Sequence, residues 1–414
     1  MRPIRRQALF VFRTLFPESA IKVLTAALLL SVSFPFLQAG EWSGQAALEA
    51  FGFSRGGSEP QQENTAFSVF VEPEYYHAWD NDRQSLTVKA FFRYDTQDAE
   101  RTHVDVRELT WLRAADSWEW RLGVRKVFWG VTESFHLVDI INQTDLVENL
   151  DGEEKLGQPM ANLAWINDWG TVDLFLLTGF RERTFAGADG RLRGGTVVDS
   201  DLAHYASGAE DQRLDAAIRY QHSVAAWDVG VSHFHGTSRE PLFTPVARDG
   251  AVVLAPYYPV IDQTGLDVQG TFGSWLLKLE GAYRHGFGET DFAAAVAGFE
   301  YTFFDVKATG LDIGVLMEFL WDERDAAATH PFADDVFVGT RWALNDTWDT
   351  TFLGGVVWDR ENAGRFWNLE ASRRLSDQLK LSLEMRTFSN TESPDLLHGF
   401  HRDDHLRLEL GYFW

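Results

Sequence analysis

Cysteine is absent from the 414 residues of the chain, and methionine occurs only four times. The absence of cysteine excludes disulfide frameworks, thiol nucleophiles and cysteine-ligated metal sites. Positive charge is also scarce, because 37 lysine and arginine residues stand against 61 aspartate and glutamate residues, for a net charge of −24. An acidic excess of this size disfavours nucleic acid as a partner, since phosphate would be repelled.

Long hydrophobic runs are missing beyond the first 39 residues. Hydrophobic residues make up 45% of the chain, but the mean hydropathy is only −0.22, so the apolar residues are dispersed. No later stretch approaches the ~20 apolar residues that a transmembrane helix needs. The sequence also lacks a Gly-x-Ser-x-Gly elbow, a His-Glu-x-x-His motif and a Gly-rich phosphate loop. We therefore expect neither a helical membrane protein nor an enzyme, and no cofactor.

Residues 1–39 have the features of a secretory signal peptide. The apolar core VLTAALLLSVSFPFLQA ends in the small residue Ala39. A membrane anchor is the disfavoured alternative, because the apolar part is short and Pro35 interrupts it. The preceding basic region contains Arg2, Arg5, Arg6, Arg13 and Lys22. Cleavage after Ala39 would leave 37 − 5 = 32 basic and 61 − 1 = 60 acidic residues, a net charge of −28.

The rest of the chain is a succession of alternating runs. In residues 311–322, LDIGVLMEFLWD, one face carries Val315, Met317 and Phe319, and the other carries Glu318 and Asp322. Apolar residues at every second position predict a β-strand. Eighteen strands are predicted, with sixteen as the alternative count. They lie near residues 44–53, 66–79, 84–95, 103–113, 117–129, 160–167, 171–181, 212–222, 227–235, 260–272, 275–286, 291–303, 311–322, 335–344, 348–359, 365–375, 379–389 and 404–414.

The connections between these runs alternate in length. Residues 81–82 and 273–274 are tight turns, whereas residues 130–159, 182–211 and 236–259 are long links. Short turns at one end and long loops at the other are typical of a transmembrane antiparallel up-and-down β-barrel. A soluble sandwich is the alternative, but the polar faces carry opposed acids and bases on one strand after another, as a wet lumen would. The sequence thus predicts an all-β barrel over residues 40–414.

The chain ends in DHLRLELGYFW, in which Leu406, Leu408, Leu410, Tyr412 and Trp414 form one face of a strand. This segment resembles the C-terminal strand of Gram-negative outer-membrane proteins. The resemblance implies a bacterial outer-membrane location, with lipid and lipopolysaccharide around the barrel. It also implies that these five side chains form an assembly signal for the barrel-assembly machinery. Together with the alternating runs, it indicates a porin-like barrel.

A second resemblance covers about fifty residues. DSWEWRLGVRKVFWG (116–130), LVDIINQTD (137–145) and KLGQPMANLAW (155–165) look like part of a poorly characterised family of large proteobacterial barrels. In that family a strand ending in Gly-Arg-Gln and Trp-Gly leads into an Asp-Val-Asn-Pro-x-Asp loop. The chain departs from the pattern at Val124, Lys126 and Gln143. The resemblance names no substrate.

The link 130–159 combines aliphatic side chains with many acids. We interpret it as a constriction loop that folds into the lumen, because a free surface loop would not need its aliphatic side chains. The alternative is a surface loop packed against its neighbours. Opposed fixed charges select solutes by sign. The expected pore constriction is formed by Arg107, Arg121 and Arg125 facing Asp139, Asp145 and Glu148.

The expected function is passive diffusion of small polar solutes through this narrowed lumen. Two alternatives remain open at this point: a non-conducting barrel with a structural, adhesive or assembly role, and a hydrolase with its site on the barrel rim. The segment HGFHRDDH (398–405) contains imidazole and carboxylate groups, but its spacing matches no metal motif, and we expect no metal site there. The sequence leaves homo-oligomerisation open.

Overall fold

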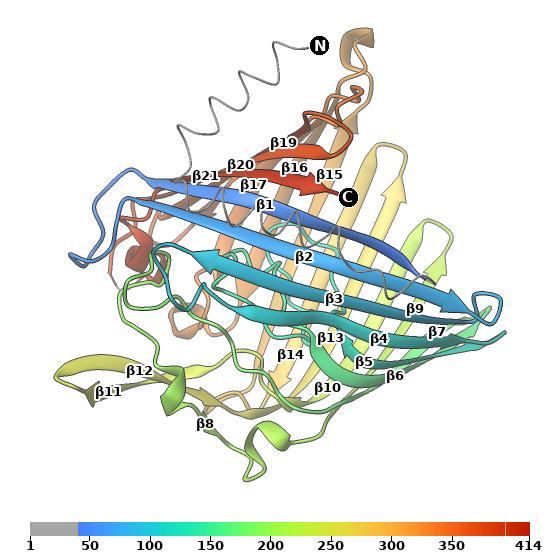
Figure 1. Cartoon of the computed structure of the whole chain (residues 1–414), viewed down its shortest axis with the longest axis horizontal. Helices are drawn as coiled ribbons and strands as arrows, with labels where there is room; N and C mark the ends of the chain where they lie inside the picture. The colour runs from blue at the N-terminus through green and yellow to red at the C-terminus, as the bar shows by residue number, and fades with distance from the viewer. Residues whose placement is uncertain (1–39, 394) are drawn as a thin grey trace.

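The computed structural model describes residues 40–393 and 395–414, and it contains one large closed barrel (Figure 1). The predicted signal peptide, residues 1–39, lies outside the described residues. Eighteen strands form the barrel sheet. They are β1 (Glu41–Phe53), β2 (Thr65–Trp79), β3 (Gln84–Asp95), β4 (Val104–Ala114), β5 (Trp118–Arg125), β6 (Gln158–Asn167), β7 (Gly170–Leu177), β9 (Asp215–Val224), β10 (Trp227–Thr237), β13 (Val260–Phe272), β14 (Trp275–His285), β15 (Phe292–Phe303), β16 (Asp312–Asp322), β17 (Asp334–Ala343), β18 (Thr351–Asp359), β19 (Arg365–Arg374), β20 (Leu379–Ser389) and β21 (His405–Phe413).

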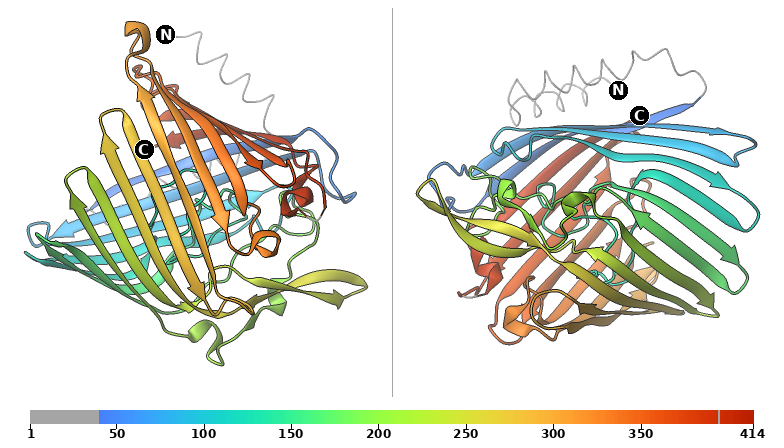
Figure 2. Two further views of the ribbon diagram at one scale, coloured as in Figure 1. Left: turned by 180° about the vertical axis from the view of Figure 1, so that it is seen from behind. Right: turned by 90° about the horizontal axis from the view of Figure 1, so that it is seen from below.

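The barrel closes between its first and last strands. β1 pairs antiparallel with β2 on one side and with β21 on the other, with Ala50 opposite Leu408 and Phe51 opposite Arg407. Each strand otherwise pairs antiparallel with its neighbour along the chain, and Figure 2 shows the strands tilted around a common axis. No helix in the described part of the chain is long and apolar enough to cross a membrane. The described helices are short 3₁₀ turns: η1 (Ser200–Leu202), η2 (Glu210–Gln212), η3 (Val306–Ala308), η4 (Asp325–Ala327) and η5 (Leu396–Phe400).

The barrel class and the count of 18 strands are confirmed, and the alternative of 16 is wrong. Each predicted run corresponds to one barrel strand, with ends that differ by a few residues. The largest differences are at the ends of the strands predicted at 117–129 and 171–181, which end at Arg125 and Leu177 because the chain then leaves the wall. Period-2 alternation located the strands well because the two faces meet different surroundings.

A second, three-stranded sheet lies outside the barrel, and the sequence prediction missed it. It consists of β8 (His204–Tyr205), β11 (Leu242–Arg248) and β12 (Ala251–Tyr258), all within segments predicted as long links. The β11–β12 hairpin extends away from the barrel in Figure 2 and turns at Asp249 and Gly250, both with positive φ. An Asp-Gly pair between two apolar runs is a strong hairpin signal, and it could have revealed these strands.

The turn between β2 and β3 shows why the short connections are rich in Asp and Asn. Asp80, Asn81 and Asp82 have φ values of 59°, 54° and 61°. Most L-residues are strained in this left-handed region, but Asp and Asn tolerate it because their short polar side chains bond locally. Three such residues in succession reverse the chain without glycine.

The apolar face of the barrel points outward. On β16, Val315, Met317 and Phe319 are 40–43% exposed, whereas the intervening Leu316 and Glu318 are only 1% exposed. This is the reverse of a soluble sheet, in which exposed side chains are polar. Exposed tryptophans occur near strand ends, including Trp227 and Trp275 at the short-turn end and Trp358 at the other. An outward apolar band with aromatic residues at both borders places the barrel in the bacterial outer membrane.

The outward orientation predicts a large difference between two added charges. Met317→Arg, at the centre of β16, should lower the free energy of unfolding by about 2–4 kcal/mol, because the guanidinium would face hydrocarbon at the bilayer midplane. Ser372→Arg adds the same group to the inward face of β19 and should cost clearly less. Urea unfolding in lipid vesicles, followed by tryptophan fluorescence, measures both losses. Equal losses would argue against the assigned faces.

Candidate functional site

Residues 126–157 connect β5 and β6 and are called here the inward loop. Their contacts reach barrel strands on several sides: β3 and β4, β14 and β16, and β20. One segment can contact strands so far apart around the sheet only if it crosses the barrel interior. The segment contains most of the link 130–159 that the sequence singled out.

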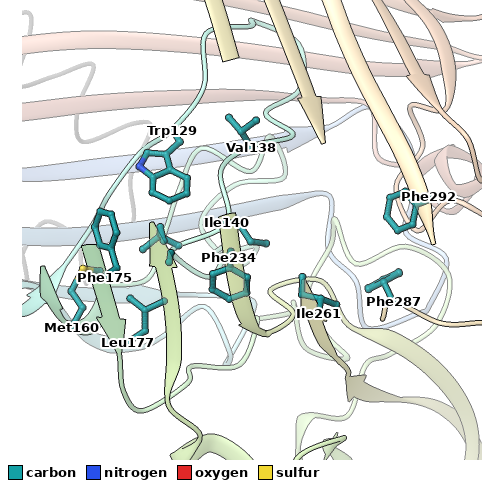
Figure 3. Close-up of a cluster of buried hydrophobic side chains, with 12 residues drawn as sticks. Trp129, Val138, Ile140, Met160, Phe175, Leu177, Phe234, Ile261, Phe287 and Phe292 are labelled. Carbon is teal, nitrogen blue, oxygen red and sulfur yellow. The ribbon is translucent and has the colours of Figure 1, made fainter. Parts of the chain in front are cut away.

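Apolar side chains anchor the first half of the inward loop to the wall. Trp129, Val138, Ile140 and Ile141 are buried together with side chains of β6, β7, β9, β10 and β13 (Figure 3). Phe135 and Leu137 pack against a second cluster, formed by Val296, Leu316, Leu320, Phe337 and Val357. These contacts explain why a loop in a polar lumen carries so many aliphatic residues, since each buried side chain contributes roughly 1.5–3 kcal/mol.

A fully buried carboxylate on β14 holds the backbone of this half. Glu280 accepts hydrogen bonds from the backbone N–H groups of Val131 at 2.7 Å, Thr132 at 3.0 Å and Val138 at 3.2 Å. The hydroxyl of Thr132 donates to it at 2.7 Å. A carboxylate that accepts several bonds compensates its own desolvation, because each bond to a charged group is stronger than a neutral one.

Glu318, on β16, holds the next two residues of the inward loop in the same way. It accepts from the backbone N–H groups of Glu133 and Ser134, both at 2.8 Å, and from the Ser134 hydroxyl at 2.6 Å. The carboxylate of Glu133 in turn lies 2.6 Å from Arg341 and 3.5 Å from Lys278. Glu280 and Glu318 thus bind five backbone amides of the inward loop, the four consecutive ones of residues 131–134 and that of Val138.

The imidazole of His136 lies between two carboxylates. Its Nε2 is 2.8 Å from Glu153 Oε1, and its Nδ1 is 3.6 Å from Glu280 Oε1. Burial opposes the charged form, but the hydrogen bond to Glu153 and the nearby negative charge of Glu280 outweigh burial and raise the pKa of His136 to about 10. The imidazole is therefore a cation at neutral pH. It links two parts of the inward loop through Glu153 and links the inward loop to β14 through Glu280.

This raised pKa predicts the pH dependence of loop anchoring. The stabilising contribution of His136 should be fully present below the ordinary imidazole pKa of about 6.5 and should disappear as the pH rises through about 10. The difference in free energy of unfolding between the wild-type protein and His136→Gln should therefore shrink over this window. Urea unfolding at a series of pH values measures it, and a difference that grows with pH would overturn the assignment.

The second half of the inward loop ends in a network of buried charges. Glu148 accepts a bidentate pair of bonds from Arg93 on β3, at 2.9 and 2.6 Å. Arg93 also lies 3.1 Å from Glu49 on β1, which binds Arg101 and Arg407 at 2.6 Å each. Burial alone would raise the pKa of Glu148, but Arg93 and Arg101 hold it below its usual value. The network joins the inward loop to β1, β3 and β21.

The tip of the inward loop contacts the wall at β20, the strand that pairs with β21. Arg386 on β20 donates to Asn149 Oδ1 at 2.6 Å and to Asp151 Oδ2 at 2.8 Å. Its side chain is almost completely buried and also lies 3.3 Å from Glu384. With Glu280, Glu318 and Arg93, Arg386 fixes the inward loop at four separate places on the barrel wall.

The six residues expected at the constriction do not form one cluster, and only two of them bind each other. Arg107 forms an ion pair with Asp145 at 2.6 Å, and both are buried. The other four residues pair elsewhere. Arg121 binds Glu119, Arg125 donates to Asn162 at 2.9 Å, Asp139 lies 3.1 Å from Lys155, and Glu148 binds Arg93. The sequence reasoning did not single out Glu280, Glu318, Arg93 or Arg386 for the site, although all four occupy inward positions of alternating strands.

Among the described residues, one group of side chains has the composition of a metal site. His103, Asp145 and Glu148 bring ligand atoms within 4.8 Å of one another. Arg107 and Arg93 already bind the two carboxylates, so their charge is compensated by the protein itself. The imidazole and carboxylate groups of the segment 398–405 do not converge on one point: Asp403 binds Arg191, His405 lies near Glu384, and His398 stacks on His401.

A cavity of about 1010 Å³ lies between the inward loop and the long links, and it is called here the vestibule. Residues of the inward loop, of the links 178–214 and 323–333, and of η5 line it, together with inward side chains of β14 to β20. Its position at the long-link end corresponds to the external side of an outer-membrane barrel. Pockets of this size accommodate a small organic molecule.

The structure is similar to solved structures of Rhodopseudomonas blastica porin variants. A variant with two substitutions is 14% identical over 91% of this chain and 100% of the porin, with a TM-score of 0.45. Two variants with three substitutions are each 13% identical over 91% of this chain and cover 100% and 99% of the porin, with TM-scores of 0.45 and 0.42. No family model and no curated protein matches the chain. These similarities are too low to assign a function, so the conclusion rests on the strand pairing and the outward apolar face. The chain forms an 18-stranded outer-membrane β-barrel of porin-like architecture.

Proposed function

We propose that the protein is a passive channel through which small hydrophilic solutes diffuse across the outer membrane, and that the inward loop narrows its lumen. The observation that carries the proposal is the fixation of residues 126–157 to opposite sides of the wall by Glu280, Glu318, Arg93 and Arg386. The inward loop does not fill the barrel, because the vestibule, a cavity of about 1010 Å³, lies next to it.

The charges around the inward loop would set the selectivity of the channel. Arg121 and Arg125 are half-buried and are the residues of this set that a solute would meet, whereas Arg107 and Asp145 are buried in their ion pair and would hold the inward loop. Paired charges of this kind orient polar solutes, whereas unpaired charges select by sign. Asp139 and Glu148 serve instead to hold the inward loop, through Lys155 and Arg93.

The surroundings of the channel follow from its outward face. Membrane lipid and lipopolysaccharide would contact the exposed apolar band. The barrel-assembly machinery would read the outward side chains of β21, namely Leu406, Leu408, Leu410 and Tyr412 together with Trp414. Small polar solutes would be the transported partners. A second copy of the chain is compatible with this surface.

Single-channel recording in planar lipid bilayers tests the proposal. Discrete openings of porin size are expected, and liposome swelling with sugars, amino acids and organic acids of increasing size should show a sharp upper limit. A protein that inserts but never conducts, even after residues 131–157 are replaced by a short Gly-Ser linker, would instead be a structural barrel. Hydrolysis of lipid or peptide by the detergent-solubilised protein would point to an enzyme on the rim.

A further inference from the structure

A row of aromatic rings lines one wall of the vestibule. The rings belong to Phe400 on η5, Phe388 on β20, Phe366 on β19, Phe332 in the link 323–333 and Phe135 on the inward loop. Successive ring centroids are 5.5, 5.3, 6.3 and 5.9 Å apart. These separations lie in the range of favourable aromatic contacts. The row therefore forms a continuous apolar surface from an external loop down to the inward loop.

Two arginines of the link 178–214 face the same cavity and have no acidic partner among residues 40–393 and 395–414. Arg183 makes only a 3.4 Å hydrogen bond from Nε to the amide oxygen of Gln143, and it forms no ion pair with any described residue. The side chain of Arg193 has neither a hydrogen bond nor an ion pair within the described chain, and its Nε is buried. Burial lowers the pKa of Arg183, and the more distant Glu240 offsets this only in part.

The other charged residues of the vestibule are compensated, which makes these two arginines distinctive. Arg239, Arg284, Arg324 and Arg386 each bind a carboxylate at 2.6–3.0 Å. Among the acids that line the cavity, Glu370 has no basic partner within ion-pair distance in the described structure. The unpaired charge is thus two positive groups against one negative group.

A half-buried guanidinium without an acidic partner is poorly compensated, and a carboxylate is the ligand that matches its geometry best, through two parallel hydrogen bonds. The adjoining row of phenylalanines offers no hydrogen bonds, so it favours a flat apolar body over a sugar or a hydrated ion. We propose that the vestibule binds organic anions that combine a carboxylate with a flat apolar body, Arg183 and Arg193 contacting the carboxylate and the aromatic row contacting the body. This inference rests on the proposed channel function and names the class of solute that the channel prefers.

Benzoate is a suitable probe, with acetate lacking the ring and benzylamine reversing the charge. Isothermal titration of the detergent-solubilised protein should give a dissociation constant for benzoate at least about tenfold lower than for either of the other two, since a charge-assisted hydrogen bond supplies a factor of this order. In planar bilayers, benzoate should cause brief current blockades that acetate and benzylamine do not cause.

The variant Arg183→Gln/Arg193→Gln should weaken benzoate binding about tenfold or more and abolish the blockades. Arg193→Gln alone removes a side chain without partners, so it should fold normally and show part of the effect. Arg248→Gln is the matched control, because this arginine lies on the external hairpin and does not line the vestibule. Phe366→Leu/Phe388→Leu should reduce the preference for benzoate over acetate.

The outcomes separate the two proposals. A conducting protein that binds benzoate no better than benzylamine, or whose binding survives loss of both arginines, overturns the anion site and leaves the channel intact. A silent protein overturns the channel, and titration in detergent still decides the anion site.

Discussion

Replacing Glu280 and Glu318 together by alanine should increase the single-channel conductance several-fold. The two carboxylates accept hydrogen bonds from five backbone N–H groups of the inward loop, and four of the five distances are 3.0 Å or shorter. Each buried donor left without an acceptor costs about 1–3 kcal/mol, so residues 131–138 should leave the wall and become mobile. A mobile loop obstructs the lumen less and should also make the current noisier.

The control for this variant removes two carboxylates that do not hold the inward loop. Glu361 and Glu392 are exposed on external links, and Glu361→Ala/Glu392→Ala should leave the conductance unchanged. Planar-bilayer recordings at one salt concentration compare the three proteins. An unchanged conductance in Glu280→Ala/Glu318→Ala would show that the inward loop does not limit the flow of ions, or that other contacts suffice to hold it.

Glu49→Gln should cost about 3–5 kcal/mol of unfolding free energy, the loss expected when one partner of a buried ion pair is removed. Glu49 is completely buried and lies 2.6 Å from both Arg101 and Arg407 and 3.1 Å from Arg93. Without it, three guanidinium groups face one another near the seam between β1 and β21. The barrel should therefore unfold at lower urea concentration and lose its resistance to SDS at lower temperature.

A double variant tests whether the loss comes from the charge. Removing one of the crowded cations as well, in Glu49→Gln/Arg407→Gln, should recover part of the stability, because the two changes act on one contact. Glu41→Gln, an exposed carboxylate near the start of the same strand, serves as the control and should cost less than about 0.5 kcal/mol. Additive losses in the double variant would argue against a coupled network.

The sequence could predict the barrel strands because each one carries the same physical signal. Residues such as Val315, Met317 and Phe319 face hydrocarbon, while Glu318 between them faces the lumen, so the alternation survives without any tertiary information. The hairpin of β11 and β12 lacks this contrast, because neither of its faces meets lipid, and Pro245 and Pro256 weaken its strand pattern. It was therefore predicted as part of a link.

The partners of the charged residues could not be predicted in the same way. Alternation tells which side chains point inward, but which acid meets which base depends on where the inward loop crosses the lumen. Glu148 meets Arg93, more than fifty positions earlier in the chain, and Glu280 meets backbone amides. Backbone amides carry no sequence signal, so neither Glu280 nor Glu318 could be recognised as an anchor of the inward loop.

Thiol modification of Leu150→Cys tests most directly whether the inward loop lies in the path of the solute. The natural chain has no cysteine, so the variant carries a single thiol, at a position that lines the vestibule. Modification with a bulky charged methanethiosulfonate reagent should reduce the single-channel conductance in one step, whereas the same treatment of Val252→Cys on the exposed external hairpin should not. An open channel whose conductance is unaffected by complete modification of Leu150→Cys would show that solutes pass elsewhere.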